Sequence, residues 1–213
     1  MNWNDHSKLK GRHALLGPSG YSWLNYSDDD PESLFSRYIS QYATEIGTLV
    51  HSYAEDRIRF RLKLNKSEKN SVLLHLLSNG IPRSVIDIDY IFPTLMAYVN
   101  DSIVCRMDPE VLLYHSDNCF GTTDAISYRN GILRINDLKT GKTTAKIEQL
   151  EIYAALFCLE YHVRPIDISM ELTLYQDGEG EMYSPEPAEI EEIMTKIVKF
   201  DKIINEWKER DAE

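Results

Sequence analysis

The segment GTTDAISYRNGILRINDLKTG, residues 121–141, carries the strongest structural signal in the chain. Two runs rich in β-branched and aromatic residues, 121–129 and 132–138, flank the pair Asn130-Gly131. Asn-Gly is the preferred pair for a two-residue hairpin, because both central residues of a type I′ turn need a positive φ. The two runs are therefore predicted to be antiparallel neighbours in a sheet.

The same hairpin brings acidic residues together. Counting outward from the turn pairs Asp124 with Asp137, and directly opposed residues point to the same face of a sheet. Like charges in that position destabilise a sheet unless a cation joins them. Lys139, two residues beyond Asp137, lies on the same face. Two carboxylates and an ammonium group on one face are consistent with a site for a hard cation, Mg²⁺ or Mn²⁺.

The motif D-x-K, formed by Asp137, Leu138 and Lys139, has two other interpretations. A solvated ion pair on the sheet surface stays open, since such pairs are common and contribute little stability. The run TGKTT at 140–144 suggests a phosphate-binding loop, which needs the pattern G-x-x-x-x-G-K-[ST]. The position five before Gly141 is Asn136, and the nearest upstream glycine is Gly131. The phosphate-loop interpretation is therefore excluded.

Helical periodicity dominates the rest of the chain. The run SDDDPESLFSRYIS, 27–40, is typical of a helix N-terminus capped by Asp30. The expected helices after it cover 44–62, 67–80, 84–100, 144–162 and 186–210, and a strand within 166–180 ends in a turn. The helix at 44–62 has one apolar face, formed by Ile46, Leu49, Val50, Tyr53, Ala54 and Ile58. This order predicts an α/β fold with a small mixed β-sheet flanked by helices and a helical N-terminal part.

Three further motifs are able to complete a site. His51 and Glu55 are four residues apart on one helical face. Gly121 precedes Asp124 by three residues, where it would tolerate close approach of another backbone or a ligand. Gln149 and Tyr153 share one face of the helix that follows the lysine. Each motif alone also has a structural explanation, as a partly buried histidine beside a solvated glutamate or as hydrogen-bonding residues at the core boundary.

Taken together, these motifs resemble the PD-(D/E)xK nuclease superfamily, most closely its RecB-type and CRISPR-associated exonuclease branch. The matching runs are G-x-x-x-H at 47–51, G-x-x-D at 121–124, D-x-K-T-G at 137–141 and Q-x-x-x-Y at 149–153, in family order. The resemblance implies a restriction-endonuclease-like core in a single domain, 1–213. Within it, 44–175 would be the catalytic core, 64–107 a helical insertion and 186–210 a C-terminal helix.

The resemblance also implies a role for each matching residue. The expected metal ligands are His51, Asp124, Asp137 and the carbonyl of Leu138, with Glu55 supporting the histidine. Lys139 would orient or activate the attacking water and steady charge on the scissile phosphate. Gln149 and Tyr153 would hold that lysine and the nucleic-acid strand. The expected cofactor is Mg²⁺ or Mn²⁺, which lowers the pKa of bound water.

Composition limits the other expectations. Some relatives carry four cysteines for an iron–sulfur cluster, whereas this chain has three, Cys105, Cys119 and Cys158, so no cluster is expected. Their wide spacing indicates reduced thiols, and no signal peptide or membrane span is recognisable, so a cytoplasmic protein without a membrane partner is expected. The net charge of −11 argues against nucleic acid, but a bound cation reverses the sign of the local field. The acidic C-terminal helix is interpreted as a solvated face or a surface for a protein partner.

The function expected from the sequence is that of a metal-dependent deoxyribonuclease, specifically an exonuclease. It would hydrolyse DNA phosphodiester bonds in DNA repair, recombination or phage DNA metabolism. The first alternative is a nuclease-fold module that docks DNA or protein without cleavage. The second is a metal-dependent hydrolase of RNA or small phosphoesters.

Overall fold

The structure is a computed structural model that describes residues 8, 14–16, 18–26 and 31–211. The chain divides into two compact units, Met1–Glu45 and Ile46–Glu213. In the first unit, the 3₁₀ helix η2 (Pro18–Asn25) precedes the start of α1 (Glu32–Arg59), and Arg37 Nε donates to the carbonyl of Leu15 at 2.7 Å. The predicted cap Asp30 lies outside the described residues.

Helix α1 corrects one prediction from the sequence. The helix expected to begin near residue 31 and the helix expected at 44–62 are one continuous helix, Glu32–Arg59. The residues between them include no proline, and Tyr42, Ala43 and Thr44 continue the helix without a break. The predicted apolar face is confirmed in the second unit, where the buried residues of α1 are Ile46, Val50, Ala54 and Ile58.

The second unit contains a mixed sheet of five strands in the order β1-β2-β3-β4-β5. The β3–β4 pair is parallel, and the other three pairs are antiparallel. The strands are β1 (Asp108–Ser116), β2 (Cys119–Arg129), β3 (Ile132–Leu138), β4 (Ser169–Gln176) and β5 (Glu179–Tyr183). The helical elements are η3 (Lys66–Glu68), α2 (Lys69–Ser78), η4 (Arg83–Val85), α3 (Ile88–Val104), α4 (Glu148–Glu160), η5 (Pro165–Asp167) and α5 (Pro187–Asp211). The predicted α/β fold is confirmed.

The β2–β3 hairpin has the predicted register. Asn130 and Gly131 have φ values of 53° and 75°, the left-handed conformation that a type I′ turn needs. The pairs run from Arg129–Ile132 next to the turn to Ala125–Asn136 at the open end of the ladder. The hairpin therefore places Asp124 and Asp137 one step beyond the last pair.

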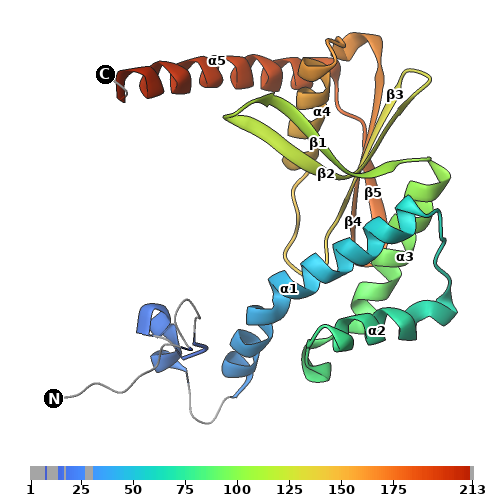
Figure 1. Cartoon of the computed structure of the whole chain (residues 1–213), viewed down its shortest axis with the longest axis vertical. Helices are drawn as coiled ribbons and strands as arrows, with labels where there is room; N and C mark the ends of the chain where they lie inside the picture. Colours follow the sequence, from blue (N-terminus) through green and yellow to red (C-terminus); the bar gives the residue numbers. More distant parts are fainter. Residues whose placement is uncertain (1–7, 9–13, 17, 27–30, 212–213) are drawn as a thin grey trace. The chain divides into compact units, whose positions relative to one another are not determined.

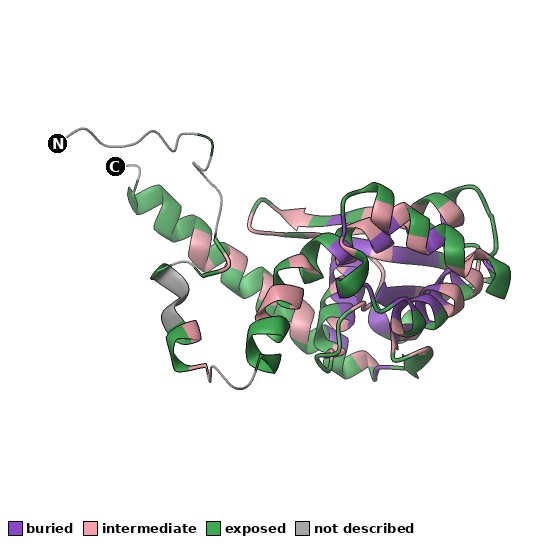
Figure 2. Ribbon diagram, turned by 90° about the horizontal axis from the view of Figure 1, so that it is seen from below, coloured by how far each residue is buried: buried purple, intermediate pink, exposed green. Residues whose placement is uncertain are grey.

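Helices α3 and α4 cover opposite faces of the sheet (Figure 1). Ile135 packs in a buried apolar cluster with Leu150 and Ala154 of α4, whereas the adjacent Asn136 donates to Ser102 of α3 at 3.1 Å. Neighbouring strand residues point to opposite faces, so these two contacts fix the layer order. Buried residues concentrate on the central strands and on the helix surfaces that face them (Figure 2).

Two further boundaries differ from the predictions. Helix α4 begins at Glu148 rather than near 144, because the side chain of Gln176 holds the preceding loop. Its amide donates to the carbonyls of Gly141 and Thr143 at 2.7 and 2.8 Å, and its oxygen accepts from Ala145 N at 3.2 Å. After β4, the predicted turn at Asp177-Gly178 is followed by a further strand, β5.

The segment 64–107 is helical, as predicted, and α3 within it packs against β3, β4 and β5. The Tyr98 ring of α3 meets the Tyr175 ring of β4 edge to face, with centroids 5.5 Å apart.

Among the described residues, no helix combines the length and apolar character that crossing a bilayer would require.

Candidate functional site

The candidate site begins where the β2–β3 ladder ends. Beyond the pair Ala125–Asn136, the carboxylate of Asp124 takes the place of a backbone partner, and its Oδ2 accepts from Leu138 N at 2.8 Å. Its other oxygen, Oδ1, lies 3.3 Å from Nδ1 of His51 on α1. One aspartate in the middle of β2 therefore joins the end of β3 to a helix that lies more than seventy residues earlier in the sequence.

A third potential ligand, Glu110 of β1, comes close to the same point. Ligand atoms of His51, Glu110 and Asp124 lie within 4.8 Å of one another. The pairs Pro109–Ala125 and Val111–Thr123 put Glu110 opposite Asp124, and its φ of 53° marks an irregularity in the strand. The sequence pattern did not identify Glu110, because Glu110 lies in the run of residues that follows 108, outside the two predicted strands 121–129 and 132–138. Extending the register of β2 into that run would have identified it.

Lys139 is held between β3 and α4. Its Nζ donates to Asp137 Oδ1 at 3.1 Å and to Gln149 Oε1 at 3.0 Å. Nζ also lies 2.8 Å from Asp137 Oδ2, but in a direction unsuited to a hydrogen bond, and among the described residues that buried oxygen has no hydrogen-bond donor. Asp137 is 3% exposed, and its buried charge is paired with the Lys139 ammonium.

Gln149 and Tyr153 continue the contacts from Lys139 to the first strand of the hairpin. Gln149 Nε2 lies 3.5 Å from Tyr153 Oη, and Tyr153 donates to the carbonyl of Thr122 at 2.6 Å. The Tyr153 ring lies so close to Gly121 that a Cβ added there would be 2.9 Å from its Cε1. A close approach does occur at Gly121, but it is made by an aromatic side chain of α4 rather than by the backbone or ligand that was predicted.

We expect Gly121→Ala to destabilise the protein by about 1–3 kcal/mol, the usual range for overpacking a tight contact. The Tyr153 ring has little freedom to retreat, because its hydroxyl is anchored to Thr122. The free energy of unfolding, measured by urea denaturation, tests this expectation. Gly141→Ala is the matched control, since nothing lies within 4 Å of the added Cβ. In a Tyr153→Ala background the penalty should disappear, and an undiminished penalty would contradict the assigned clash.

The site brings several carboxylates close together, and their pKa values respond to it. Burial and then the charge of Asp124 raise the pKa of Asp137, against the opposing effect of Lys139. Burial and Asp124 also raise the pKa of Glu110. For His51, burial lowers the pKa, but the hydrogen bond and charge of Asp124 outweigh it and the net shift is upward. The two carboxylate shifts come first from burial and then from repulsion by Asp124, and a cation would relieve the repulsion.

The donor set fits a divalent cation. Carboxylate oxygens are the ligands that Mg²⁺ and Mn²⁺ prefer, and the imidazole of His51 is more suited to Mn²⁺. The residues whose ligand atoms could hold such an ion together are His51, Glu110 and Asp124. Asp137 is paired with Lys139, and ligation by Asp137 stays a prediction.

The structure therefore brings together the predicted residues His51, Asp124, Asp137, Lys139, Gln149 and Tyr153. Glu55, predicted to support His51, instead pairs with Arg59 one turn further along α1. Its charge contributes to raising the pKa of Glu110, so it lies near the site. The backbone N–H of Leu138 binds Asp124, and ligation by the Leu138 carbonyl stays a prediction.

Comparison with known proteins gives one match. A family model described as "Protein of unknown function (DUF2800)" matches residues 13–177, and the chain belongs to this family. The match includes every residue of the candidate site and ends before α5. No curated protein and no solved structure matches the chain.

Proposed function

We propose that this DUF2800 protein is a metal-dependent deoxyribonuclease, an exonuclease of the PD-(D/E)xK type. The observation that carries the proposal is the joint placement of Asp124, Asp137 and Lys139 at the open end of the β2–β3 hairpin. A solvated surface ion pair would not leave Asp137 3% exposed with an unsatisfied oxygen. The exonuclease assignment rests on the resemblance to the exonuclease branch.

In the proposed enzyme, Asp124, Asp137 and His51 would hold Mn²⁺ or Mg²⁺, and Glu110 is the fourth candidate ligand. The bound ion would lower the pKa of a coordinated water and offset charge on the phosphate. The role of the protein is to fix these ligands before substrate arrives. The hydrogen bond from Leu138 N to Asp124 and the burial of Asp137 both restrict the carboxylates to one arrangement.

Lys139 is the residue positioned to act on the reacting groups. Its ammonium has three N–H donors, of which two are directed at Asp137 and Gln149. The third has no hydrogen-bond acceptor among the described residues, and it would donate to the attacking water or to a non-bridging phosphate oxygen, where negative charge grows during hydrolysis. Gln149 and Tyr153 fix the direction of the ammonium through their contacts with each other and with Thr122. The lysine is thus oriented in advance rather than by the substrate.

Cleavage of end-labelled linear DNA and closed circular DNA by the full-length protein tests the proposal. Each substrate is incubated with Mg²⁺, with Mn²⁺ and with EDTA. We expect release of short products from linear DNA with either metal, intact closed circles, and no cleavage with EDTA. Cutting of closed circles would overturn the exonuclease assignment and keep the metal-dependent chemistry.

Two further outcomes separate the alternatives. Protein that binds DNA or another protein, but leaves single-stranded, duplex and nicked DNA intact with Mn²⁺, would be a docking module. Metal-dependent hydrolysis of RNA or a small phosphodiester without hydrolysis of DNA would indicate the other hydrolase class. Either result would overturn the deoxyribonuclease assignment.

A further inference from the structure

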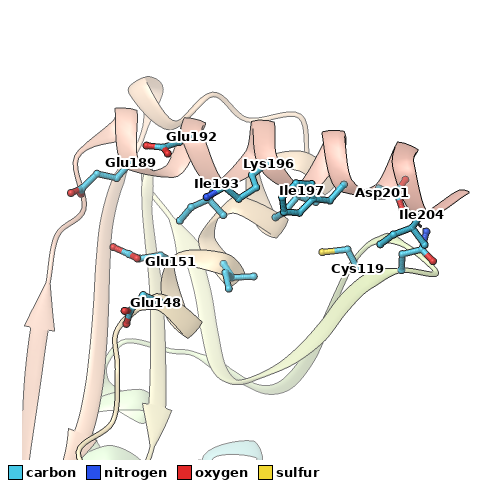
Figure 3. Close-up of a pocket in the computed structure, with 13 residues that line it drawn as sticks. Cys119, Glu148, Glu151, Glu189, Glu192, Ile193, Lys196, Ile197, Asp201 and Ile204 are labelled. Atoms are coloured by element: carbon cyan, nitrogen blue, oxygen red, sulfur yellow. Dashed lines mark hydrogen bonds between the residues drawn. The ribbon is translucent and has the colours of Figure 1, made fainter. Parts of the chain in front are cut away.

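A second feature, remote from the candidate metal ligands, is a groove of about 650 Å³ between α4 and α5. The turn region of the β1–β2 hairpin closes one end of it, through Asn118 and Cys119. Figure 3 shows α5 side chains facing α4 across the groove, with Cys119 at the end nearer Ile204. Helix α5 lies beyond the residues matched by the family model, whereas the α4 wall of the groove lies within them.

The α5 wall of the groove is an apolar stripe. Ile193, Ile197, Phe200 and Ile204 all line it and follow one another at intervals of four, three and four residues. Phe200 is 52% exposed, and Ile152 on the α4 wall is 43% exposed. Apolar side chains at alternating three- and four-residue intervals form a seam of the kind that packs against another helix. Ile193 and Ile197 already pack in part against the buried cluster that includes α4, so the apolar surface left for a helical occupant is chiefly that of Phe200 and Ile152.

The rim of the groove is acidic. Glu148 and Glu151 line it from α4, and Glu189 and Glu192 line it from α5, with Lys196 as the lining residue of opposite sign. Glu189 is already engaged by Tyr183 Oη at 2.8 Å, whereas Glu148 is exposed and Glu151 half-buried. Burial, followed by the charges of Glu189 and Glu148, raises the pKa of Glu151, which is the response expected to crowded carboxylates. Basic side chains on an occupant would relieve this crowding.

We propose that the groove binds an amphipathic helix of a partner protein that carries Lys or Arg beside its apolar stripe. Its apolar side chains would pack on Phe200 and Ile152, and its basic side chains would meet Glu148, Glu151 and Glu192. A second copy of this chain is a poorer occupant, because two-fold pairing of the same surface would bring the acidic rims together. The proposal does not depend on the nuclease assignment.

Fluorescence anisotropy tests the proposal directly. The probe is a labelled synthetic helix of about 18 residues, with Leu at positions of the helix-in-groove pattern and Lys or Arg beside them. A control peptide has Glu in place of each basic residue. We expect saturable binding of the basic probe to the full-length protein, weakened at least tenfold for the Glu peptide. Affinity should also fall as salt is raised, because exposed charges are screened.

Matched variants locate the binding surface. Phe200→Ala should lower the affinity for the probe at least tenfold, since aromatic side chains buried at an interface contribute much of its binding energy. Val198→Ala is the control, because Val198 is 47% exposed on the same helix but is not a lining residue of the groove. The double variant Glu148→Gln, Glu151→Gln should bind the probe more weakly, and its affinity should depend less on salt concentration.

Several results would overturn the proposal. The first is that the basic probe shows no saturable binding. The second is that the Glu peptide binds as tightly as the basic probe. The third is that Phe200→Ala and Val198→Ala weaken binding of the probe equally. Sedimentation that shows a dimer of the full chain, converted to a monomer by Phe200→Asp, would assign the groove to a second copy instead. Metal-dependent DNA cleavage by Phe200→Ala should equal that of the unaltered protein, which separates this proposal from the nuclease assignment.

Discussion

Asp124→Asn should abolish metal-dependent DNA cleavage, with a loss of about a thousandfold or more in rate. Loss of a ligand carboxylate removes several kcal/mol of charge stabilisation, and each 1.36 kcal/mol is about a factor of ten in rate. The fold should survive the change. The amide oxygen of asparagine can still accept the hydrogen bond from Leu138 N, and Asp124 is on the rim of the core rather than inside it. Initial rates with saturating Mn²⁺, combined with urea unfolding of the same variant, check both parts.

Asp117→Asn is the matched control for Asp124→Asn. Asp117 is an exposed carboxylate in the β1–β2 turn that accepts from Tyr114 Oη at 2.9 Å, away from the proposed ligands. Its neutralisation lowers the net negative charge by the same amount but should leave the cleavage rate within twofold. Equal loss in both variants would attribute the effect to overall charge, and full activity of Asp124→Asn would contradict the nuclease assignment.

Whether Glu110 is a ligand of the proposed ion can be tested by substitution. If Glu110 joins His51 and Asp124 as a ligand, Glu110→Gln should weaken Mn²⁺ binding in calorimetry, although less than Asp124→Asn does. The reason is geometric, because Asp124 contacts both His51 and the backbone of Leu138, whereas Glu110 is exposed at the edge of the group.

The hairpin explains why much of the site could be predicted from the sequence. Asn130-Gly131 fixes the turn, the turn fixes the register, and the register places Asp124 beside Asp137. Lys139 follows Asp137 by two residues, directly after the end of β3, whereas its contact with Gln149 was expected from the family resemblance and not from spacing. Each step from the turn to Lys139 depends on sequence-local geometry, in which the alternatives are few.

The parts that could not be predicted depend on contacts between distant segments. Glu110 reaches the site only through the pairing of β1 with β2 and an unusual φ, neither of which its own neighbours in the sequence signal. The start of α4 depends on Gln176, about thirty residues further along the chain, whose side chain holds the loop at Gly141 and Thr143. The pairing of Glu55 with Arg59 is different, because it is a local contact four residues along α1 that competes with the predicted contact to His51.

Lys139→Met should reduce DNA cleavage by about a hundredfold to a thousandfold, the usual effect of removing one preorganised donor to developing charge. It should also destabilise the fold by about 1–3 kcal/mol, the usual cost of leaving a buried polar group without its partner, because Asp137 is 3% exposed and loses its cation. The two effects have different causes and can be separated. In Lys139→Met combined with Asp137→Asn, the buried charge is gone, so stability measured by urea unfolding should largely return. Cleavage should not return, because the donor and a proposed ligand are both lost.

Lys142→Met provides the control within the same loop. Lys142 pairs with Asp87 at 3.0 Å, but its side chain is 71% exposed, and exposed pairs contribute about 0–1 kcal/mol. Its loss should therefore leave both the cleavage rate and the free energy of unfolding nearly unchanged. If Lys139→Met and Lys142→Met behaved alike, the ammonium of Lys139 would be one more surface charge. Both variants remove one positive charge from the same loop. A large loss of cleavage rate in Lys139→Met alone would therefore show that the position of Lys139, and not its charge by itself, is what cleavage requires.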